Sequence, residues 1–209
     1  MSTLIIGASG SMGARYRSIL QYLGEQFVGS DIALGMTEGE IFKKTANAER
    51  IILCTPTENH YQWLQKLVPL GKPILCEKPI TKSLEELENI FNLLKNYETE
   101  FSMTFQYSEL VRPRVSNWKS EYNYFRTGKD GLYWDCLQII ALAQGEVILG
   151  NDSPVWKCII NGERINFTDM DIAYLNFVRK WLTGLIKQTP DMLFSIHEKT
   201  ERIHSEHSK

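Results

Sequence analysis

The sequence lacks the features that mark membrane, nucleic-acid-binding and secreted proteins. Its 209 residues carry a formal net charge of −2, so no excess of charge draws the chain to nucleic acid or to an anionic lipid surface. No apolar run approaches the roughly 18 residues that a membrane-spanning helix needs. The chain opens on a short apolar strand, without the basic region and cleavage site of a secretory signal. We therefore expect a cytoplasmic protein that contacts neither nucleic acid nor membrane.

The sequence also lacks paired cysteines of the CxxC type. Its four cysteines, Cys54, Cys76, Cys136 and Cys158, are far apart, and at least three of them stand in apolar contexts. Buried free thiols are therefore favoured over disulfides or metal ligands, and no metal site is predicted. Free thiols fit a reducing compartment.

Strand and helix patterns alternate along the first half of the chain. Short apolar strands are predicted at 4–6, 27–29, 51–54, 74–76 and 101–105. Helical spacing separates them, most clearly over 83–97, where Ser83 and Glu86 form a capping box. The alternation predicts an α/β domain over residues 1–106, with a parallel sheet and right-handed crossovers.

The second half changes character. Asn161 and Gly162 give a two-residue hairpin signal between apolar strand patterns. Two helices are predicted afterwards, over 171–182 and 191–205. We expect a smaller α+β domain over residues 107–209, with a mostly antiparallel open sheet, that contributes to substrate binding and oligomerisation.

A glycine-rich turn follows the first predicted strand and opens a helix, which is the context that a dinucleotide-binding turn requires. Glycines let the backbone approach a pyrophosphate, and the helix N-terminus favours its charge. The spacing here is GxxGxxG, one residue wider at its start than GxGxxG, and a tight turn packed on a helix is the alternative. The candidate cofactor-binding residues of the turn are Gly7, Ser9, Gly10, Ser11, Met12 and Gly13.

Asp31 stands at the end of the predicted second strand. A carboxylate there can accept hydrogen bonds from ribose hydroxyls and would repel a 2′-phosphate. No Arg or Lys follows it closely. NAD is therefore favoured over NADP as the cofactor, while a turn or N-cap role is the alternative for Asp31.

Two polar clusters end the third and fourth predicted strands. They read IILCTPTENH, from Ile51 to His60, and PILCEKP, from Pro73 to Pro79. In an open α/β sheet, ligands lie outside the carboxyl ends of the strands, so a cofactor and a substrate would meet at these clusters. Lys78 stands in the second cluster and is the candidate of greatest chemical interest. The alternative for Lys78 is an ordinary surface lysine.

The glycine turn, Asp31 and the two clusters resemble the Gfo/Idh/MocA family of sugar and cyclitol oxidoreductases. The resemblance covers roughly the first half of the chain. It implies a Rossmann domain followed by a domain with an open, mostly antiparallel sheet, an NAD(P)-dependent hydride transfer on a sugar-like substrate, and a homodimer. It further implies the site roles. The cofactor side would hold Thr55, Pro56, Thr57, His60 and Glu77, and Lys78 would face the substrate hydroxyl as the catalytic residue that takes or returns its proton during hydride transfer. For His60, a hydrogen-bonding residue at a helix N-terminus is the alternative.

The chain departs from the family pattern in its second half. Members usually carry a run of the form DxGxHxxD, and the matching run here places Asp135 at the aspartate and Ile139 at the histidine. Asp135 is therefore a second catalytic candidate, with a structural or capping carboxylate as the alternative, and the acid/base histidine is missing. The second domain is also short by comparison with the family. Two further interpretations stay open: a dinucleotide-binding regulatory or partner protein with little turnover, and a reductase for a substrate that needs no histidine.

Overall fold

The computed structural model describes residues 2–110, 120–123, 137–138, 142, 147–150, 157–160, 163–165 and 167–207. The chain divides into two compact units. Unit 1 comprises Met1–Thr104 and Val178–Pro190, and unit 2 comprises Phe105–Phe177 and Asp191–Lys209. From the sequence, a single domain boundary is expected near residue 106. In the structure, residues 178–190 are grouped with unit 1 as well.

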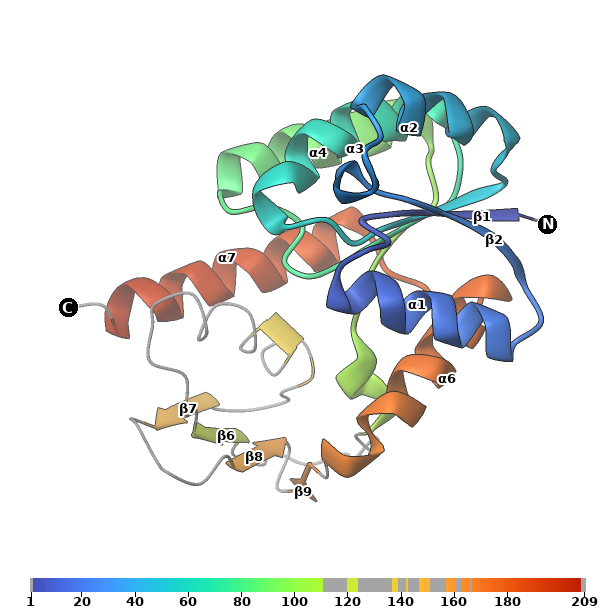
Figure 1. Cartoon of the computed structure of the whole chain (residues 1–209). Helices are drawn as coiled ribbons and strands as arrows, with labels where there is room; N and C mark the ends of the chain where they lie inside the picture. The colour runs from blue at the N-terminus through green and yellow to red at the C-terminus, as the bar shows by residue number, and fades with distance from the viewer. Residues whose placement is uncertain are drawn as a thin grey trace. The chain divides into compact units, whose positions relative to one another are not determined.

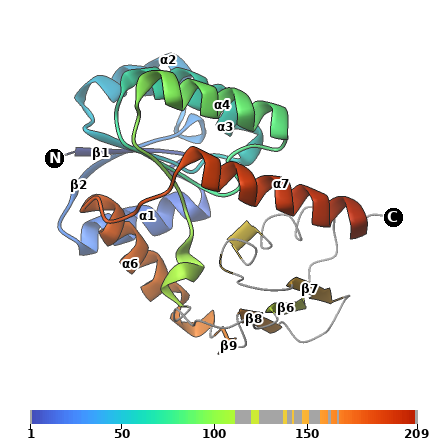
Figure 2. The ribbon, with the colours of Figure 1, turned by 180° about the vertical axis from the view of Figure 1, so that it is seen from behind.

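Unit 1 is built on a five-stranded parallel sheet with helices on both faces. The strand order is β2-β1-β3-β4-β5. The strands are β1 (Ser2–Ile6), β2 (Gln26–Ser30), β3 (Arg50–Leu53), β4 (Ile74–Cys76) and β5 (Phe101–Met103). Helix α1 (Ser11–Tyr22) lies on one face, whereas α2 (Glu38–Lys44), α3 (His60–Leu67) and α4 (Leu84–Tyr97) lie on the other (Figures 1 and 2). The predicted α/β Rossmann-like architecture of the first half is confirmed.

The central strands are uninterrupted apolar runs because both faces of the sheet are covered. Leu4–Ile6, Ile51–Leu53 and Ile74–Cys76 are all buried. A strand with one solvated face would alternate instead. Two of the cysteines, Cys54 and Cys76, are free and buried, as predicted.

Side-chain caps fix where two of the helices begin. The Ser83 hydroxyl accepts the Glu86 N–H at 3.1 Å at the start of α4, as half of the predicted capping box. The start of α2 has a complete box, in which the Thr37 N–H donates to Glu40 at 2.7 Å and the Glu40 N–H donates to Thr37 at 3.3 Å. Each cap satisfies N–H groups that the helix leaves without partners.

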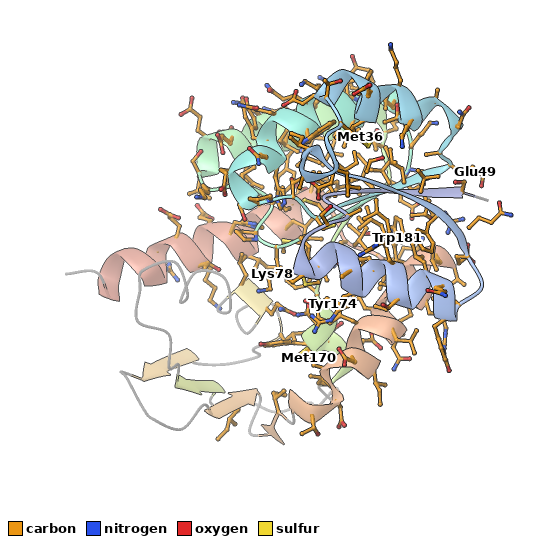
Figure 3. The ribbon with its side chains drawn as sticks, viewed as in Figure 1. Met36, Glu49, Lys78, Met170, Tyr174 and Trp181 are labelled. Atoms are coloured by element: carbon orange, nitrogen blue, oxygen red, sulfur yellow. The ribbon has the colours of Figure 1, made fainter. Side chains whose placement is uncertain are left out.

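Residues 178–190 complete unit 1 through side chains. The Arg50 guanidinium lies 6.0 Å from the ring centroid of Trp181 and donates to the Leu182 carbonyl at 3.1 Å (Trp181 is labelled in Figure 3). The Gln188 amide pairs with both backbone groups of Met103, accepting its N–H at 2.7 Å and donating to its carbonyl at 3.0 Å. Gln188 thus covers part of the edge strand β5, which would otherwise present unpaired groups there.

Unit 2 contains a second sheet of order β7-β6-β8-β9. Its strands are β6 (Ser120–Asn123), β7 (Val147–Gly150), β8 (Lys157–Ile160) and β9 (Glu163–Arg164). The pairs β6–β8 and β8–β9 are antiparallel, and β6–β7 is parallel. Helix α6 (Met170–Leu182) begins in unit 2, and α7 (Pro190–His207) follows. The predicted hairpin residues Asn161 and Gly162 lie outside the described residues.

Among the described residues, every helix is too short or too polar to span a lipid bilayer.

Candidate functional site

A pocket of about 500 Å³ opens at the carboxyl ends of β1, β2 and β3. The chain passes from β1 to β2 on one side and then to β3 on the other, so the strand order reverses between β1 and β3. Open α/β sheets bind ligands outside the strand ends at such a switch point. The lining residues are Ile6, Gly7, Ser9, Gly10, Asp31, Ile32, Ala33, Ile41, Cys54, Thr55, Pro56, Asn59 and Trp63. The topology therefore places this pocket where a ligand is expected.

The pocket brings together only part of the predicted cofactor set. Gly7, Ser9, Gly10, Asp31, Thr55 and Pro56 line it. The other predicted residues, Ser11, Met12, Gly13, Thr57, His60, Glu77 and Lys78, are not among its lining residues.

The glycine turn needs glycine at two positions for reasons of the fold itself. Gly7 has φ +94°, and a Cβ there would lie 2.6 Å from the backbone of Cys54 and Thr55. A Cβ on Gly13 would lie 2.3 Å from the Gly7 carbonyl oxygen. A Cβ on Gly10 would be in ordinary contact, 3.6 Å from that same oxygen. Gly10 is therefore the one of the three whose lack of a side chain leaves room at the pocket without being required by packing.

The N-terminus of α1 faces solvent without a side-chain cap. Its N-cap is Gly10, which has no side chain to accept a hydrogen bond, and the first turn holds no acidic residue. Gly10 and Ser11 are exposed. The helix start therefore keeps N–H groups and a partial positive charge available for an anion.

Asp31 is held by two backbone donors. Its carboxylate accepts the Ser9 N–H at 2.8 Å and the Ala33 N–H at 3.0 Å, and it caps the short helix Ile32–Leu34. The N-cap alternative is thus realised, while the residue also lines the pocket. Each carboxylate oxygen retains lone-pair capacity for a hydroxyl donor.

Thr55 presents an unsatisfied hydroxyl at the pocket. Among the described residues, its Oγ1 is one of the buried side-chain atoms that have no hydrogen-bond partner. A buried polar atom without a partner costs free energy unless a ligand or water satisfies it. Cys54 beside it is inert, because burial raises the pKa of its thiol and Sγ donates to the Ile6 carbonyl at 3.3 Å.

His60 links the two polar clusters from beneath the surface. Its Nε2 lies 2.8 Å from the Thr55 carbonyl oxygen, and its Nδ1 lies 3.0 Å from the Pro79 carbonyl oxygen. Burial lowers the pKa of the imidazole, while the hydrogen bonds to these carbonyls oppose the shift. His60 is 1% exposed, so in this structure it joins the ends of β3 and β4.

Glu77 is a buried carboxyl held by hydroxyl groups. The Tyr16 hydroxyl on α1 donates to its Oε1 at 2.5 Å, and the same hydroxyl lies 2.9 Å from Thr104 Oγ1. The Lys78 N–H donates to Glu77 Oε2 at 3.2 Å. Burial raises the pKa of Glu77, and the Tyr16 hydrogen bond and the charge of Lys78 oppose that shift.

Lys78, which is labelled in Figure 3, is half-buried. Both of its neighbours in the chain are anchored. On one side Glu77 is bound by Tyr16, and on the other the Pro79 carbonyl faces His60. The backbone at Lys78 is therefore fixed on both sides. The second predicted catalytic residue, Asp135, lies outside the described residues, as does Ile139.

Sequence reasoning missed Tyr16 and Thr104. Both read as core positions, since Tyr16 belongs to the apolar stripe of α1 and Thr104 follows a buried strand. The available signal was a phenol on the inward face of a helix, because a buried tyrosine hydroxyl usually needs a partner. The identity of that partner could not be read, since Glu77 is 61 positions away.

A family model and two curated relatives each match part of this chain. A family model described as an oxidoreductase family with an NAD-binding Rossmann fold matches residues 35–105. Inositol 2-dehydrogenase from Rhizobium meliloti (strain 1021) is 24% identical over 66 residues, which are 32% of this chain and 20% of that protein. An uncharacterized oxidoreductase from Schizosaccharomyces pombe is 33% identical over 51 residues, which are 24% of this chain and 14% of that protein. The matches thus span a fifth or less of these curated relatives.

Solved structures share the fold at low identity. The WlbA dehydrogenase from Thermus thermophilus, in complex with NAD and UDP-GlcNAcA, has a TM-score of 0.71 at 13% identity, covering 98% of this chain and 94% of that chain. A putative myo-inositol dehydrogenase from Sinorhizobium meliloti 1021 has a TM-score of 0.71 at 12% identity, covering 96% of this chain and 95% of that chain. At such identities the likeness shows the fold.

These findings confirm the family resemblance and, at the level of the family, the predicted cofactor NAD. The family match covers both polar clusters, whereas the glycine turn and Asp31 precede it. Residues 35–105, less than half of the chain, match the model of the Gfo/Idh/MocA oxidoreductase family, which is described by an NAD-binding Rossmann fold.

Proposed function

We propose that the protein is an NAD-dependent oxidoreductase that moves hydride between nicotinamide and a hydroxyl or keto carbon of a sugar-like molecule. One observation carries the proposal: the pocket at the sheet's switch point is bordered by an uncapped helix start, a carboxylate and an unsatisfied buried hydroxyl. These are the groups that a dinucleotide needs for its pyrophosphate, its ribose and its polar edges.

The residues present fit NAD. At Gly7 and Gly13 the backbone packs too closely to leave room for a side chain. Gly10 has no side chain to block the approach of a ligand to the start of α1. Asp31 would accept from ribose hydroxyls, and Thr55 Oγ1 would gain the partner that it lacks among the described residues. Ile32, Ile41 and Trp63 supply an apolar wall suited to a flat ring.

Lys78 would move the proton that accompanies hydride transfer. Bound NAD would supply the hydride acceptor. In the oxidation direction a hydroxyl proton passes to the neutral amine of Lys78, and in the reduction direction the ammonium returns a proton to the oxygen of the carbonyl. Its anchored backbone supports this role, because a proton-transfer group acts only from a fixed position. Asp135 remains a proposed second participant.

A polyhydroxylated substrate is supported by the relatives. The Thermus thermophilus dehydrogenase was solved in complex with NAD and UDP-GlcNAcA, and one curated relative is an inositol 2-dehydrogenase. The same relatives support the proposed oxidative or reductive chemistry at a hydroxyl-bearing carbon.

Fluorescence titration with NADH, and separately with NADPH, tests the nucleotide site. We expect saturable NADH binding, weaker NADPH binding, and loss of the preference in Asp31→Ala. Absence of binding by either nucleotide would refute the proposal.

A panel of sugars, cyclitols and nucleotide sugars then tests turnover. We expect Lys78→Ala to lower the rate by about 10²–10⁴-fold, with Lys82→Ala as the matched control because the Lys82 side chain is exposed nearby on the same loop. NADH binding without any rate that depends on Lys78 would favour the non-catalytic interpretation. The proposed homodimer is tested separately by sedimentation, where a monomer at all concentrations would contradict it.

A further inference from the structure

The hydroxyl of Tyr16 joins the nucleotide end of the site to its lysine end. Tyr16 lies on α1, the helix whose uncapped start borders the pocket, and it is fully buried. Its hydroxyl reaches Glu77 after β4 and Thr104 after β5. Neither the pocket nor the proposed chemistry requires these contacts, so they need an explanation of their own.

We propose that Tyr16 is a positioning residue for Lys78 and acts through the buried carboxyl of Glu77. The proposal deepens the proposed function and rests on it for its purpose, namely to hold the lysine in place. The geometric basis is a continuous path: phenol to carboxyl at 2.5 Å, and carboxyl to the Lys78 N–H at 3.2 Å.

The hydrogen-bond network accepts either protonation state of Glu77. With Glu77 ionised, Tyr16 donates to the carboxylate and Thr104 donates to Tyr16. With Glu77 protonated, the direction reverses: Glu77 donates to Tyr16, Tyr16 to Thr104, and Thr104 to the Cys76 carbonyl, 3.3 Å away. Each hydroxyl has one proton and can also accept, so neither pattern strands a donor.

The contact between Glu77 and Lys78 is at the backbone of the lysine. Glu77 Oε2 accepts the Lys78 N–H, and Glu77 is 7% exposed, so its side chain has little room to leave this position. Tyr16 donates to the other oxygen of the same carboxyl. Loss of the Tyr16 hydroxyl would therefore loosen the carboxyl and, through it, the backbone of Lys78.

Competitive acetylation tests this without nucleotide or substrate. The full chain is treated with a trace of acetic anhydride at pH 8, and peptide mass spectrometry gives the labelling ratio of Lys78 to the exposed Lys82. Tyr16→Phe removes the donor, and Glu77→Ala removes the carboxyl. Because a lysine whose backbone is no longer held samples more exposed positions, we expect the ratio to rise about threefold or more in Glu77→Ala and to rise in Tyr16→Phe.

The double variant and a matched control sharpen the result. Tyr16→Phe in the Glu77→Ala background should add nothing, because the proposed effect passes through the carboxyl. Tyr22→Phe on the same helix, where the side chain is 75% exposed, should leave the ratio unchanged. Thr104→Val, which removes the other partner of the phenol, should give a smaller rise and serves if Tyr16→Phe does not fold.

A purely structural role would lower the unfolding midpoint without changing the ratio, and that outcome would overturn the proposal. An unchanged ratio in Glu77→Ala, or additive effects in the double variant, would overturn it as well. Since no nucleotide is present, failed NADH binding would refute the proposed function and leave the labelling result standing.

Discussion

The polar groups that follow β3 and β4 differ in whether they have hydrogen-bond partners within the protein. After β3, the Thr55 hydroxyl has no partner among the described residues and lies at a pocket. After β4, the Glu77 carboxyl is bound by Tyr16 and by the Lys78 N–H, and the Pro79 carbonyl faces His60. A buried polar group at a pocket that lacks a hydrogen-bond partner can bind a ligand. Buried polar groups that have partners within the protein instead hold the protein's own atoms in place.

The largest expected effect comes from the glycine turn beside the β3 end. Gly7→Ala combines a left-handed φ with a Cβ 2.6 Å from backbone atoms. We expect a loss of about 2–5 kcal/mol in the free energy of unfolding, from backbone strain and overpacking together. Urea unfolding followed by circular dichroism measures it.

Gly10→Ala is the matched control. Its Cβ would make only ordinary contact, so the free energy of unfolding should change by less than about 1 kcal/mol, while NADH affinity falls because the new methyl group lies at the pocket. Equal destabilisation by the two substitutions would contradict the distinction between a fold glycine and a ligand glycine.

His60→Ala tests the link between the two strand ends. It removes the donor that serves the Thr55 or Pro79 carbonyl and leaves a cavity in the core. We expect a loss of about 2–3 kcal/mol in the free energy of unfolding. His60→Gln, which keeps an amide donor, should recover part of it. A change under about 0.5 kcal/mol in His60→Ala would mean that the link is not structural.

Glu77 should give the β4 end a pH dependence of defined sign. Its folded pKa is raised by burial, so the neutral carboxyl is favoured in the folded state. Its contribution to stability is full below the unfolded pKa of 4.5 and is lost as the pH rises through the folded pKa. Urea unfolding over a pH series should therefore show wild type losing stability relative to Glu77→Gln as the pH rises.

Glu40 is a control, because its contribution to stability should change with pH in the opposite direction to that of Glu77. The backbone and side chain of Thr37 lower the pKa of this exposed carboxylate. Its contribution is present above 4.5 and is lost as the pH falls through the folded pKa. Parallel slopes for Glu40→Gln and Glu77→Gln would contradict the assignment of Glu77 as a carboxyl dominated by burial.

The smallest stability effect should come from Thr55→Val. It replaces a hydroxyl that lacks a partner among the described residues, so the free energy of unfolding should stay within about 0.5 kcal/mol of wild type. NADH affinity should fall, because the lost hydroxyl is proposed to meet the nucleotide. Strong destabilisation would show that the hydroxyl already has a structural partner.

The features that could be predicted from the sequence are those that depend on residues close together in the chain. The strand and helix alternation, the Ser83 cap and the glycine turn were readable because each is settled by spacing and by backbone conformation. Asp31 was placed at the end of β2, and both of its proposed roles, N-cap and pocket residue, fit the structure. Whether it contacts NAD stays a prediction, as it does for the other site residues.

Contacts between distant residues could not be predicted from one sequence. Tyr16 meets Glu77 across 61 positions, and Gln188 meets Met103 across 85. His60 was predicted to border the cofactor, yet the structure buries it between two carbonyls and outside the pocket lining. Which buried partner satisfies a polar side chain depends on tertiary packing, which spacing along the chain does not encode.

The pairing of Gln188 with Met103 has a consequence for how the protein is made. The final piece of the first unit emerges from the ribosome only after the whole of residues 105–177 has been synthesised. Until then the backbone groups of Met103 at the edge of β5 lack their Gln188 partner. A fragment that ends at residue 104 would lack this partner permanently. Residues 178–190 therefore complete the pairing of a sheet whose five strands were translated much earlier.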